Sequence, residues 1–510
     1  MSKMKIGINV FSNKIEHGHP SFEIPFQRGG FDFTVCHFSP GEYSVKEACA
    51  KIKEVMEKCR ERGVEIIVNH EWQNFEHNCM GKDGWDWAQS GDGCHRLNLP
   101  DEYKQTLAQQ ENCVGVMYDE FEHTIINRNL SLSLASKGKI KENVFPLLKE
   151  KNIVKQGELL SAQLKEYANS IKEKGVKTLC GEHVFPVLFH TFARNGITPN
   201  FKSQKESYSN VQYAVAAGAA LEYNTELFNC VDLWYRMKCP GHTPKEMFSN
   251  LCFAFLAGVD RVYVETAHHF IDKDKDGNDI YNEYGKKYSE FAKNYRNATR
   301  DYNVRDYRPE IGIIRYDNGF WGQKDPFMWR FMLFGNKDIK PVKQSYEWIQ
   351  AMRTVTHGET SKYGISWDKI SPWSLRKHRS FASMNAAAVF DDKVRRDKLE
   401  SLKLCFLCGE SIEEQTLADV YALVKDGLTV VTPKRFLPDE LKSMVNGAYS
   451  EIADGKGKWM VSENLCSRRV RKNAAPSLGN KGEIRLCFGE NRVVRLKIDK
   501  NGEGFTVLKR

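Results

Sequence analysis

Hydrophobic and polar positions change their period repeatedly along the first 270 residues. Short runs rich in β-branched residues, such as 5–11 (KIGINVF) and 64–70 (VEIIVNH), alternate with longer stretches in which apolar residues recur every three or four positions. The stretch 44–62 is one of these and predicts an amphipathic helix that Gly63 ends. This alternation is typical of βα units built around a parallel sheet.

Eight such strand-like runs precede residue 270, and eight parallel strands at this spacing predict a (β/α)8 TIM barrel. The expected strands are 5–11, 31–37, 64–70, 112–118, 177–182, 197–202, 219–223 and 260–266. Further helices are expected over 157–174 and 244–257, each followed by a glycine. A doubly wound open sheet is the alternative topology.

The pattern changes near residues 300–310 and again after residue 480. Strand-like runs at 311–316, 386–390, 402–408 and 428–432 predict a smaller α/β domain. Residues 483–509 hold three short β-rich runs joined by turns, which predict a short C-terminal β appendage. We therefore expect a barrel over 1–305, a second α/β domain over 306–445 and a β-rich region over 446–510.

Composition restricts the class of protein. Hydrophobic residues make up 41% and charged residues 28%, which excludes a largely disordered chain. The net charge of +9 is mild for 510 residues, and no basic stretch is interleaved with aromatics, so we expect no nucleic-acid partner. The sequence has no run of about 18 apolar residues, so it predicts no membrane-spanning helix. The 14 cysteines lack zinc-binding spacing, which favours reduced core thiols and a cytoplasmic location.

Acidic residues stand where several predicted strands end. Asp119 and Glu120 end the fourth strand, Glu182 the fifth, Glu222 the seventh and Glu265 the eighth. The carboxyl ends of barrel strands meet at one mouth, where active sites of such barrels lie. Carboxylates gathered there are costly unless they are protonated, paired or bound to a metal, so the cluster indicates function.

Glu120 and Glu222 form the sharper pair, because they bracket the mouth from strands four and seven. Retaining glycoside hydrolases use one carboxylic acid to protonate the leaving oxygen and a second carboxylate, about 5 Å away, to attack the anomeric carbon. We therefore predict a retaining glycoside hydrolase with Glu120 as acid and base and Glu222 as nucleophile. Glu226 and Glu265 are the rival nucleophiles.

The stretch 219–234 (AALEYNTELFNCVDLW), with 247–258 after it, resembles the nucleophile region of family 42 β-galactosidases. In that family and its clan, an Asn-Glu pair that ends strand four carries the acid/base, and the matching positions here are Asp119 and Glu120. The aspartate replaces the asparagine that contacts the sugar 2-hydroxyl, so the resemblance does not imply galactose.

The second domain resembles that family's amidotransferase-like domain, from the opening strand IGIIRYD through AAAVFDD and LKLCFLCGES to KDGLTVVTP. It lacks a Gly-x-Cys-x-Gly nucleophile elbow. The resemblance therefore implies a structural domain or an oligomer contact, and we expect a homo-oligomer.

Aromatic and polar residues near the strand ends complete the expected sugar site. The expected substrate-binding residues are Asp119, Trp72, Trp85, Trp87, His183, Glu182, Glu265 and Tyr223. Flat rings stack on sugar faces, although aromatic residues also pack protein cores. The expected partner is a carbohydrate, either a short oligosaccharide or a small glycoside.

Residues 272–283 (DKDKDGNDIYNE) match the spacing of a calcium-binding loop. Asp272, Asp274, Asp276 and Glu283 fall at ligand positions, and Gly277 falls at the sharp turn. Position 8 of the motif is a polar residue, so a solvated turn is the competing interpretation. The expected reaction requires no cofactor, and Ca²⁺ would be structural.

Two other functions remain open from the sequence. His17 and His19 after strand one, with His183 after strand five, resemble the ligand set of metal-dependent amidohydrolases. Alternatively, the aromatic platforms belong to a carbohydrate-binding protein that lacks catalysis.

Overall fold

The structure is a computed structural model. It describes residues 1–38, 43–70, 99–119, 126–127, 150–183, 186–205, 207–233, 241–322, 333–336, 338–340, 342–361 and 378–509. Of the expected site residues, Trp72, Trp85, Trp87 and Glu120 lie outside these ranges, as does the side chain of His183.

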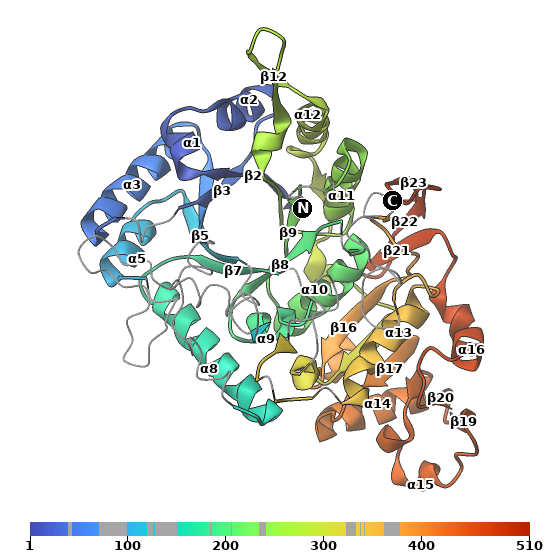
Figure 1. Cartoon of the computed structure of the whole chain (residues 1–510). Helices are drawn as coiled ribbons and strands as arrows, with labels where there is room; N and C mark the ends of the chain where they lie inside the picture. Colours follow the sequence, from blue (N-terminus) through green and yellow to red (C-terminus); the bar gives the residue numbers. More distant parts are fainter. Residues whose placement is uncertain are drawn as a thin grey trace.

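Eight parallel strands close into a barrel (Figure 1). In order they are β2 (Lys5–Phe11), β3 (Phe33–His37), β4 (Glu65–Asn69), β5 (Cys113–Asp119), β7 (Thr178–His183), β8 (Thr198–Ser203), β9 (Phe228–Asp232) and β10 (Arg261–Glu265). β10 pairs with β2 and closes the barrel. The predicted TIM barrel is therefore confirmed, including the strand expected at 197–202.

Helices surround the barrel. They are α1 (Ser12–Glu16), α2 (Pro20–Arg28), α3 (Val45–Glu61), α5 (Asp101–Ala108), α8 (Ile153–Lys172), α9 (Phe189–Arg194), α10 (Ser209–Tyr223), α11 (Pro244–Leu256) and α12 (Glu283–Tyr295). The helices predicted over 44–62, 157–174 and 244–257 are confirmed as α3, α8 and α11. Ser44 and Glu47 form a capping box that fixes the start of α3, and Gly63, at φ 66°, follows its end.

The strand expected at 219–223 is wrong, because these residues form the last turns of α10. Every residue from Ser209 to Leu221 is buried, so the helix is apolar on all sides and shows no amphipathic period. A buried helix of this kind cannot be distinguished from a buried strand by periodicity. Asn224 ends the helix in a left-handed conformation, and the seventh strand is Phe228–Asp232.

The second domain is a six-stranded sheet with the order β16-β14-β17-β18-β20-β19. Its strands are β14 (Ile311–Arg315), β16 (Ala387–Asp391), β17 (Leu404–Cys408), β18 (Thr429–Thr432), β19 (Ser450–Asp454) and β20 (Gly457–Val461). All pair in parallel except β19 with β20. Its helices are α13 (Glu347–Val355), α14 (Glu414–Asp426), α15 (Asp439–Lys442) and α16 (Arg468–Leu478).

The boundary expected at residue 445 falls inside this second domain, because β19 and β20 hydrogen-bond into its sheet. The separate β appendage is the antiparallel sheet of β21 (Glu483–Phe488), β22 (Arg492–Ile498) and β23 (Phe505–Lys509).

Smaller pairs are β1 (Ser2–Lys3) with β13 (Thr299–Arg300), β6 (Ile126–Asn127) with β15 (Leu333–Phe334), and the hairpin of β11 (Ile271–Lys273) and β12 (Asp279–Tyr281). The short 3-10 helices are η3 (Ala267–Phe270), η4 (Val304–Asp306), η5 (Asp317–Phe320), η6 (Lys343–Tyr346), η8 (Arg396–Lys398) and η9 (Lys434–Phe436). Among the described helices, none is both long and apolar enough to cross a membrane. Every cysteine that the structure describes is a free thiol.

Helix α10 joins the barrel to the second domain, packing on β8 on one side and on β16 on the other (Figure 1). The approach to β16 is close because Gly218 has no side chain. A Cβ atom there would lie 1.7 Å from the carbonyl oxygen of Val389. The two bodies therefore share one continuous hydrophobic core along this helix.

We expect Gly218→Ala to lower the free energy of unfolding by about 2–3 kcal/mol, because the added methyl group meets β16 backbone that cannot rotate away. Chemical denaturation of the variant measures this change. Gly157→Ala in α8 is the matched control, since its Cβ meets the Asn318 side chain, which can move, and alanine favours a helix. Equal stability of both variants would contradict the close packing of α10 on β16.

Candidate active site at the barrel mouth

A polar layer lies directly above the apolar layer inside the barrel. Residues two apart on a strand face the same side, so they share the barrel interior. The apolar layer includes Val35, Ile67, Met117, Cys180, Cys230 and Tyr263. Two residues farther along the same strands stand His37, Asn69, Asp119, Glu182, Asp232 and Glu265, all buried. Six strands thus bring a polar side chain to their carboxyl ends, where active sites of such barrels lie.

Lys202 of β8 adds a positive charge to this layer. Its Nζ lies 2.8 Å from Glu182 Oε1, 3.1 Å from Glu265 Oε2 and 3.7 Å from Asp232 Oδ2. The lysine is 2% exposed, so these ion pairs form away from bulk water, where charge interactions are stronger than at a surface. One ammonium therefore connects carboxylates from three other strands.

Asp119 and Glu265 face each other across the mouth. They end β5 and β10, the fourth and eighth strands, which lie on opposite sides of an eight-stranded barrel. One side-chain atom each of His37, Asp119 and Glu265 lies within 4.8 Å of the other two. Asn69 Nδ2 donates to Asp119 Oδ2 at 2.8 Å, and Cys230 Sγ donates to Glu265 Oε2 at 3.3 Å. Both carboxylates are therefore held in defined orientations.

The pKa of Glu182 is shifted by its surroundings. Burial raises its pKa well above the usual range, and Asp119 and Glu265 raise it further, although Lys202 acts in the opposite direction. Asn200 Nδ2 also donates to Glu182 Oε2 at 3.3 Å. The mouth thus holds one carboxyl group that takes up a proton more readily than an ordinary glutamate, and such a difference between neighbouring acids suits acid–base chemistry.

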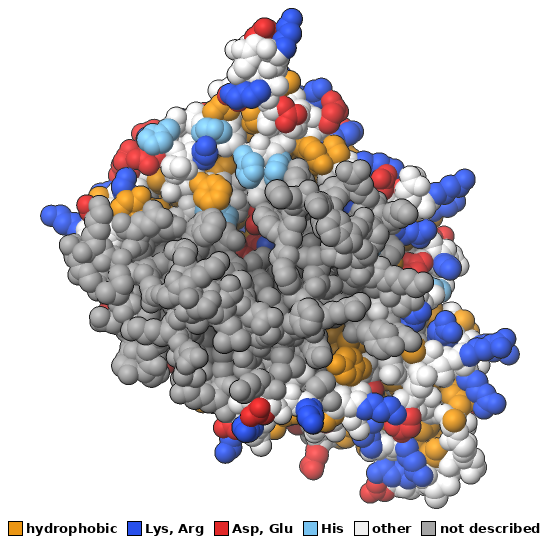
Figure 2. All heavy atoms as spheres, viewed as in Figure 1, with side chains coloured by type: hydrophobic (Ala, Val, Ile, Leu, Met, Phe, Trp, Pro, Cys, Tyr) orange, Lys and Arg blue, Asp and Glu red, His pale blue; other side chains and the backbone are white. Residues whose placement is uncertain are grey.

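The same side chains include donor atoms that metal ions use. Glu182, Cys230 and Glu265 form a second group with ligand atoms within 4.8 Å. The Lys202 ammonium already pairs with two of these three residues, so a divalent cation would have to compete with it. His17 and His19, named for the amidohydrolase alternative, lie around the α1–α2 turn, and His19 Nδ1 accepts the N–H of Ser21 as the cap of α2. Figure 2 shows histidines on this face below the β11–β12 hairpin.

The mouth brings together three residues that the sequence named there, Asp119, Glu182 and Glu265. His183 ends β7, as expected from the sequence. His37, Asn69, Lys202 and Asp232 were not expected from the sequence. His37, Asn69 and Lys202 are close to the carboxyl ends of predicted strands and could have been found by extending the inward period of two. Asp232 was missed because the seventh strand was misplaced.

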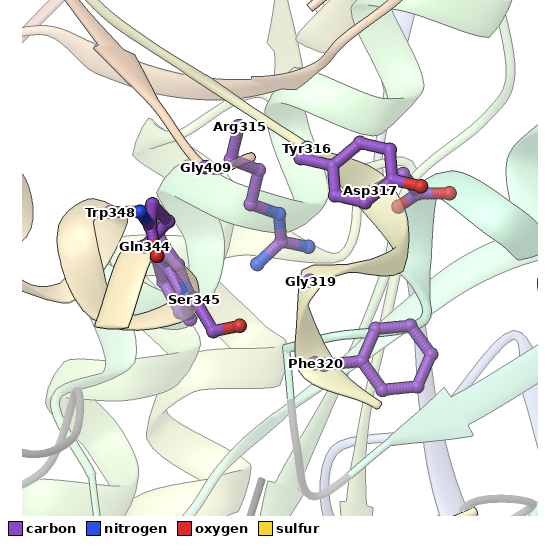
Figure 3. A pocket seen from close by; sticks show the side chains of 9 residues that line it. All are labelled: Arg315, Tyr316, Asp317, Gly319, Phe320, Gln344, Ser345, Trp348 and Gly409. Atoms are coloured by element: carbon purple, nitrogen blue, oxygen red, sulfur yellow. The ribbon is translucent and has the colours of Figure 1, made fainter. Parts of the chain in front are cut away.

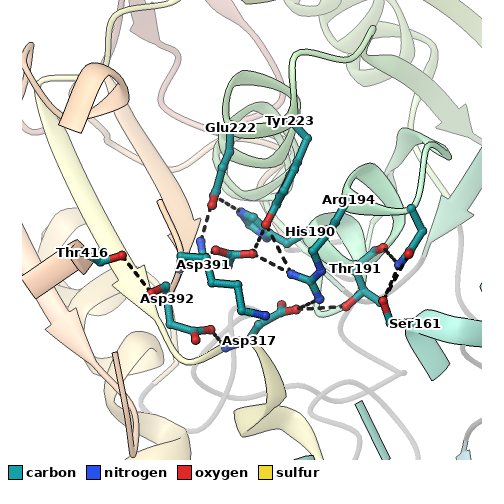
Figure 4. A network of polar contacts seen from close by, with 12 residues as sticks. Ser161, His190, Thr191, Arg194, Glu222, Tyr223, Asp317, Asp391, Asp392 and Thr416 are labelled. Carbon is teal, nitrogen blue, oxygen red and sulfur yellow. Dashed lines mark hydrogen bonds and ion pairs between the residues drawn. The ribbon is translucent and has the colours of Figure 1, made fainter. Parts of the chain in front are cut away.

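Glu222 is not at the mouth, and its expected place at a strand end is wrong. It lies in the last turn of α10, between the barrel and the second domain (Figure 4). Its Oε2 accepts the backbone N–H of Asp391 at 3.1 Å and lies 3.8 Å from His190 Nε2. Burial, together with Asp391, raises the pKa of Glu222 well above the usual range. The rival Glu226 lies just before β9 begins, at the opposite end of the barrel from the mouth.

Tyr223 belongs to the same interface network. Its hydroxyl donates to Asp391, which also pairs with Arg194 at 2.8 Å. Arg194 of α9 pairs with Asp317 as well, again at 2.8 Å, so one guanidinium joins the ends of β14 and β16 to the barrel (Figure 4). Burial alone would raise the pKa of Asp391, but hydrogen bonding to Glu222 and the charges of His190 and Arg194 lower it to about 2. Tyr223 and Glu222 therefore hold the two domains together.

The second domain has a small cavity where β14 and β17 end (Figure 3). Arg315, Asp317, Ser345, Trp348 and Gly409 are among the residues that line it, and the volume of about 10 Å³ fits about one water molecule. Gly409 takes the positive-φ position, at 100°, immediately after β17. It has no side chain that could act as a nucleophile there. The cavity is consistent with the expected structural role of this domain.

The calcium-loop motif forms the β11–β12 hairpin. Asp274 Oδ1 accepts the backbone N–H groups of Asp276 and Asn278 at 2.9 Å each, and Glu283 pairs with Lys286 in the first turn of α12. Asp272 lies in β11 and pairs across the hairpin with Ile280. Binding of Ca²⁺ to Asp272, Asp274, Asp276 and Glu283 stays a prediction.

No protein-family model matches the chain, and no curated protein matches its sequence. Among solved structures, an exo-β-1,4-mannosidase from Opitutaceae bacterium strain TAV5 is similar over 93% of this chain and 95% of its own, with 9% identity and a TM-score of 0.50. An apo exo-carrageenase of family GH42 from Bacteroides ovatus is similar over 98% of this chain and 76% of its own, with 10% identity and a TM-score of 0.51. At these identities the likeness shows a shared fold, which the resemblance to family 42 implied.

We expect Asp391→Asn to lower the free energy of unfolding by about 3–5 kcal/mol at pH 7, because Arg194 loses one of its two buried partners. The pKa of Asp391 is about 2 in the folded protein and near 4 when unfolded, so its charge stabilises the fold above pH 4. This contribution is lost as the pH falls towards 2.

Denaturation curves of wild type and variant between pH 2 and pH 7 measure the difference. Asp426→Asn, which breaks an exposed ion pair with Arg396, is the control and should cost at most about 1 kcal/mol. A loss from Asp391→Asn that matches this control, or one that stays constant with pH, would contradict the proposed charge network.

Proposed function

We propose that this chain is a retaining glycoside hydrolase acting on short oligosaccharides or small glycosides. One observation carries the proposal: the carboxyl groups of Asp119 and Glu265 meet across the mouth of a TIM barrel within 4.8 Å. Retaining glycosidases need a nucleophilic carboxylate and an acid/base carboxyl on opposite sides of such a site. Glu265 supplies the first, and Asp119 marks the opposite strand end, which the acid/base follows in the sequence. The fold shared with an exo-mannosidase and an exo-carrageenase supports the same class.

Glu265 is the nucleophile in this proposal. Its carboxylate pairs with the Lys202 ammonium at 3.1 Å and accepts a hydrogen bond from Cys230, so its orientation is fixed from two strands. It projects from the eighth strand towards the strand that Asp119 ends. Among the nucleophile candidates named from the sequence, Glu222 and Glu226 lie away from the mouth, which leaves Glu265.

Glu120 is the acid/base, because it follows Asp119 directly where β5 ends. In the first step the Glu265 carboxylate bonds to the anomeric carbon, while Glu120 gives its proton to the leaving oxygen. In the second step Glu120 takes a proton from water, whose oxygen displaces Glu265 from the sugar. Asp119, held by Asn69, accepts a hydrogen bond from a sugar hydroxyl or pairs with an amino substituent.

We expect Glu265→Ala to lower kcat on activated aryl glycosides by roughly a thousandfold or more, because no covalent intermediate forms. Azide should restore turnover by attacking from the vacated side and give a glycosyl azide. A panel that includes amino and N-acetylamino sugars, with product analysis by NMR, measures both rate and anomeric outcome.

Two controls accompany this test. Asp232→Ala removes another carboxylate that faces Lys202 and should yield no glycosyl azide. Glu222→Gln keeps a polar side chain of the same shape at the domain interface, away from the mouth, and should keep the wild-type kcat. Azide rescue in Asp232→Ala alone would overturn the assignment of Glu265. Loss of wild-type activity with a chelator, restored by Zn²⁺, would instead favour metal-dependent hydrolysis.

A further inference from the structure

The buried lysine at the mouth is unusual for its position. Lys202 is 2% exposed, and lysine is almost never fully buried unless it is paired. It projects from β8, while its partners come from β7, β9 and β10. A lysine that served only to hold two strands together would need one such partner. This lysine reaches three carboxylates, including the one proposed as nucleophile.

We propose that Lys202 is a positioning residue that holds Glu265 aimed for attack on the sugar. This inference rests on the proposed function. Glu265 is contacted by Lys202 from β8 and Cys230 from β9, and Asp119, Glu182, Asp232 and His37 are the titratable groups around it. Among the described residues around Glu265, Lys202 carries the positive charge that offsets the repulsion between the carboxylates at the mouth.

The geometry favours this role over a purely structural one. Lys202 Nζ lies 2.8 Å from Glu182 Oε1 and 3.1 Å from Glu265 Oε2, so it contacts the two carboxylates at once. The ammonium therefore lies between Glu182 and Glu265 and forms an ion pair with each. Asn200 in turn fixes Glu182 and hydrogen-bonds with the hydroxyl of Tyr263 at 3.0 Å. The chain of contacts runs from the barrel interior to the reacting carboxylate.

The test is chemical rescue of a Lys202 side-chain truncation in the whole 510-residue chain. In Lys202→Ala, Glu265 loses its cationic partner, so kcat/KM should fall by about a hundredfold or more. The substitution also leaves a space that a small alkylammonium ion can enter, so ethylammonium or propylammonium should raise kcat/KM again. The rescue should saturate and depend on chain length. 1-Propanol, which lacks the charge, should give none. A structural role alone would not produce a rescue that needs positive charge.

Lys205→Ala is the matched control. Lys205 is also buried, at 4% exposure, but it pairs with Glu246 rather than with Glu265. Alkylammonium ions should leave its kcat unchanged. A folded Lys202→Ala that no amine rescues, or a Lys202→Met variant with wild-type kcat, would overturn the inference.

A second variant covers the case in which Lys202→Ala does not fold. Lys202→Met with Asp232→Asn removes one negative charge together with the positive charge, which favours folding. It should stay inactive because Glu265 keeps its hydrogen bond from Cys230 but loses its cationic partner. Activity of this double variant at the level of Asp232→Asn would also overturn the inference. If the wild type cleaves no glycoside, the proposed function itself is refuted. If azide rescues Glu265→Ala but Lys202→Met is fully active, the proposed function stands and only the role of Lys202 is refuted.

Discussion

Closely spaced negative charges govern the arrangement of the barrel mouth. Asp119, Glu182, Asp232 and Glu265 come from four strands and are all buried. Carboxylates brought this close in a low dielectric repel one another, and the fold compensates in two ways. Lys202 lies among three of them, and Glu182 has its pKa raised well above the usual range. The ion pairs of Lys202 and the raised pKa of Glu182 both follow from this electrostatic constraint.

The alternation of side chains along parallel strands creates that constraint. Inside the barrel, apolar residues such as Val35, Ile67 and Met117 fill one layer, and the residue two positions later projects above it. The same rule that packs the interior therefore delivers acids to the mouth. Cys230 and Tyr263 belong to the apolar layer but contact the polar layer above it. Cys230 donates to Glu265, and the Tyr263 hydroxyl accepts from Asn200. Packing and chemistry are adjacent layers of the same strands.

A second electrostatic network joins the barrel to the second domain. Helix α10 meets β16 so closely that only glycine fits at position 218, and Glu222 at its end meets Asp391. Arg194 then connects Asp391 with Asp317. The acid that resembled a catalytic nucleophile thus has an interdomain role. A buried acid with a raised pKa indicates catalytic function only when it also lies at a candidate active site, because networks at domain interfaces raise pKa values in the same way.

The sequence by itself determined the barrel, the second α/β domain and the presence of acids at the mouth. Each of these follows from local periods: runs of β-branched residues, helices with an apolar stripe, and acids directly after strands. Asp119, Glu182 and Glu265 were identified this way because their strands are short and end at clear boundaries.

Only the tertiary structure decided which acids meet. The alanine-rich segment before Glu222 is buried on all sides between β8 and β16, and this burial removes the periodicity that distinguishes a helix from a strand. The extent of the second sheet also depended on pairing, since β19 and β20 join strands that lie far away in the chain. The role of Lys202 also required the coordinates. Its three partners lie on other strands, 20 or more positions away in the sequence, and such long-range contacts leave no periodic pattern along the chain.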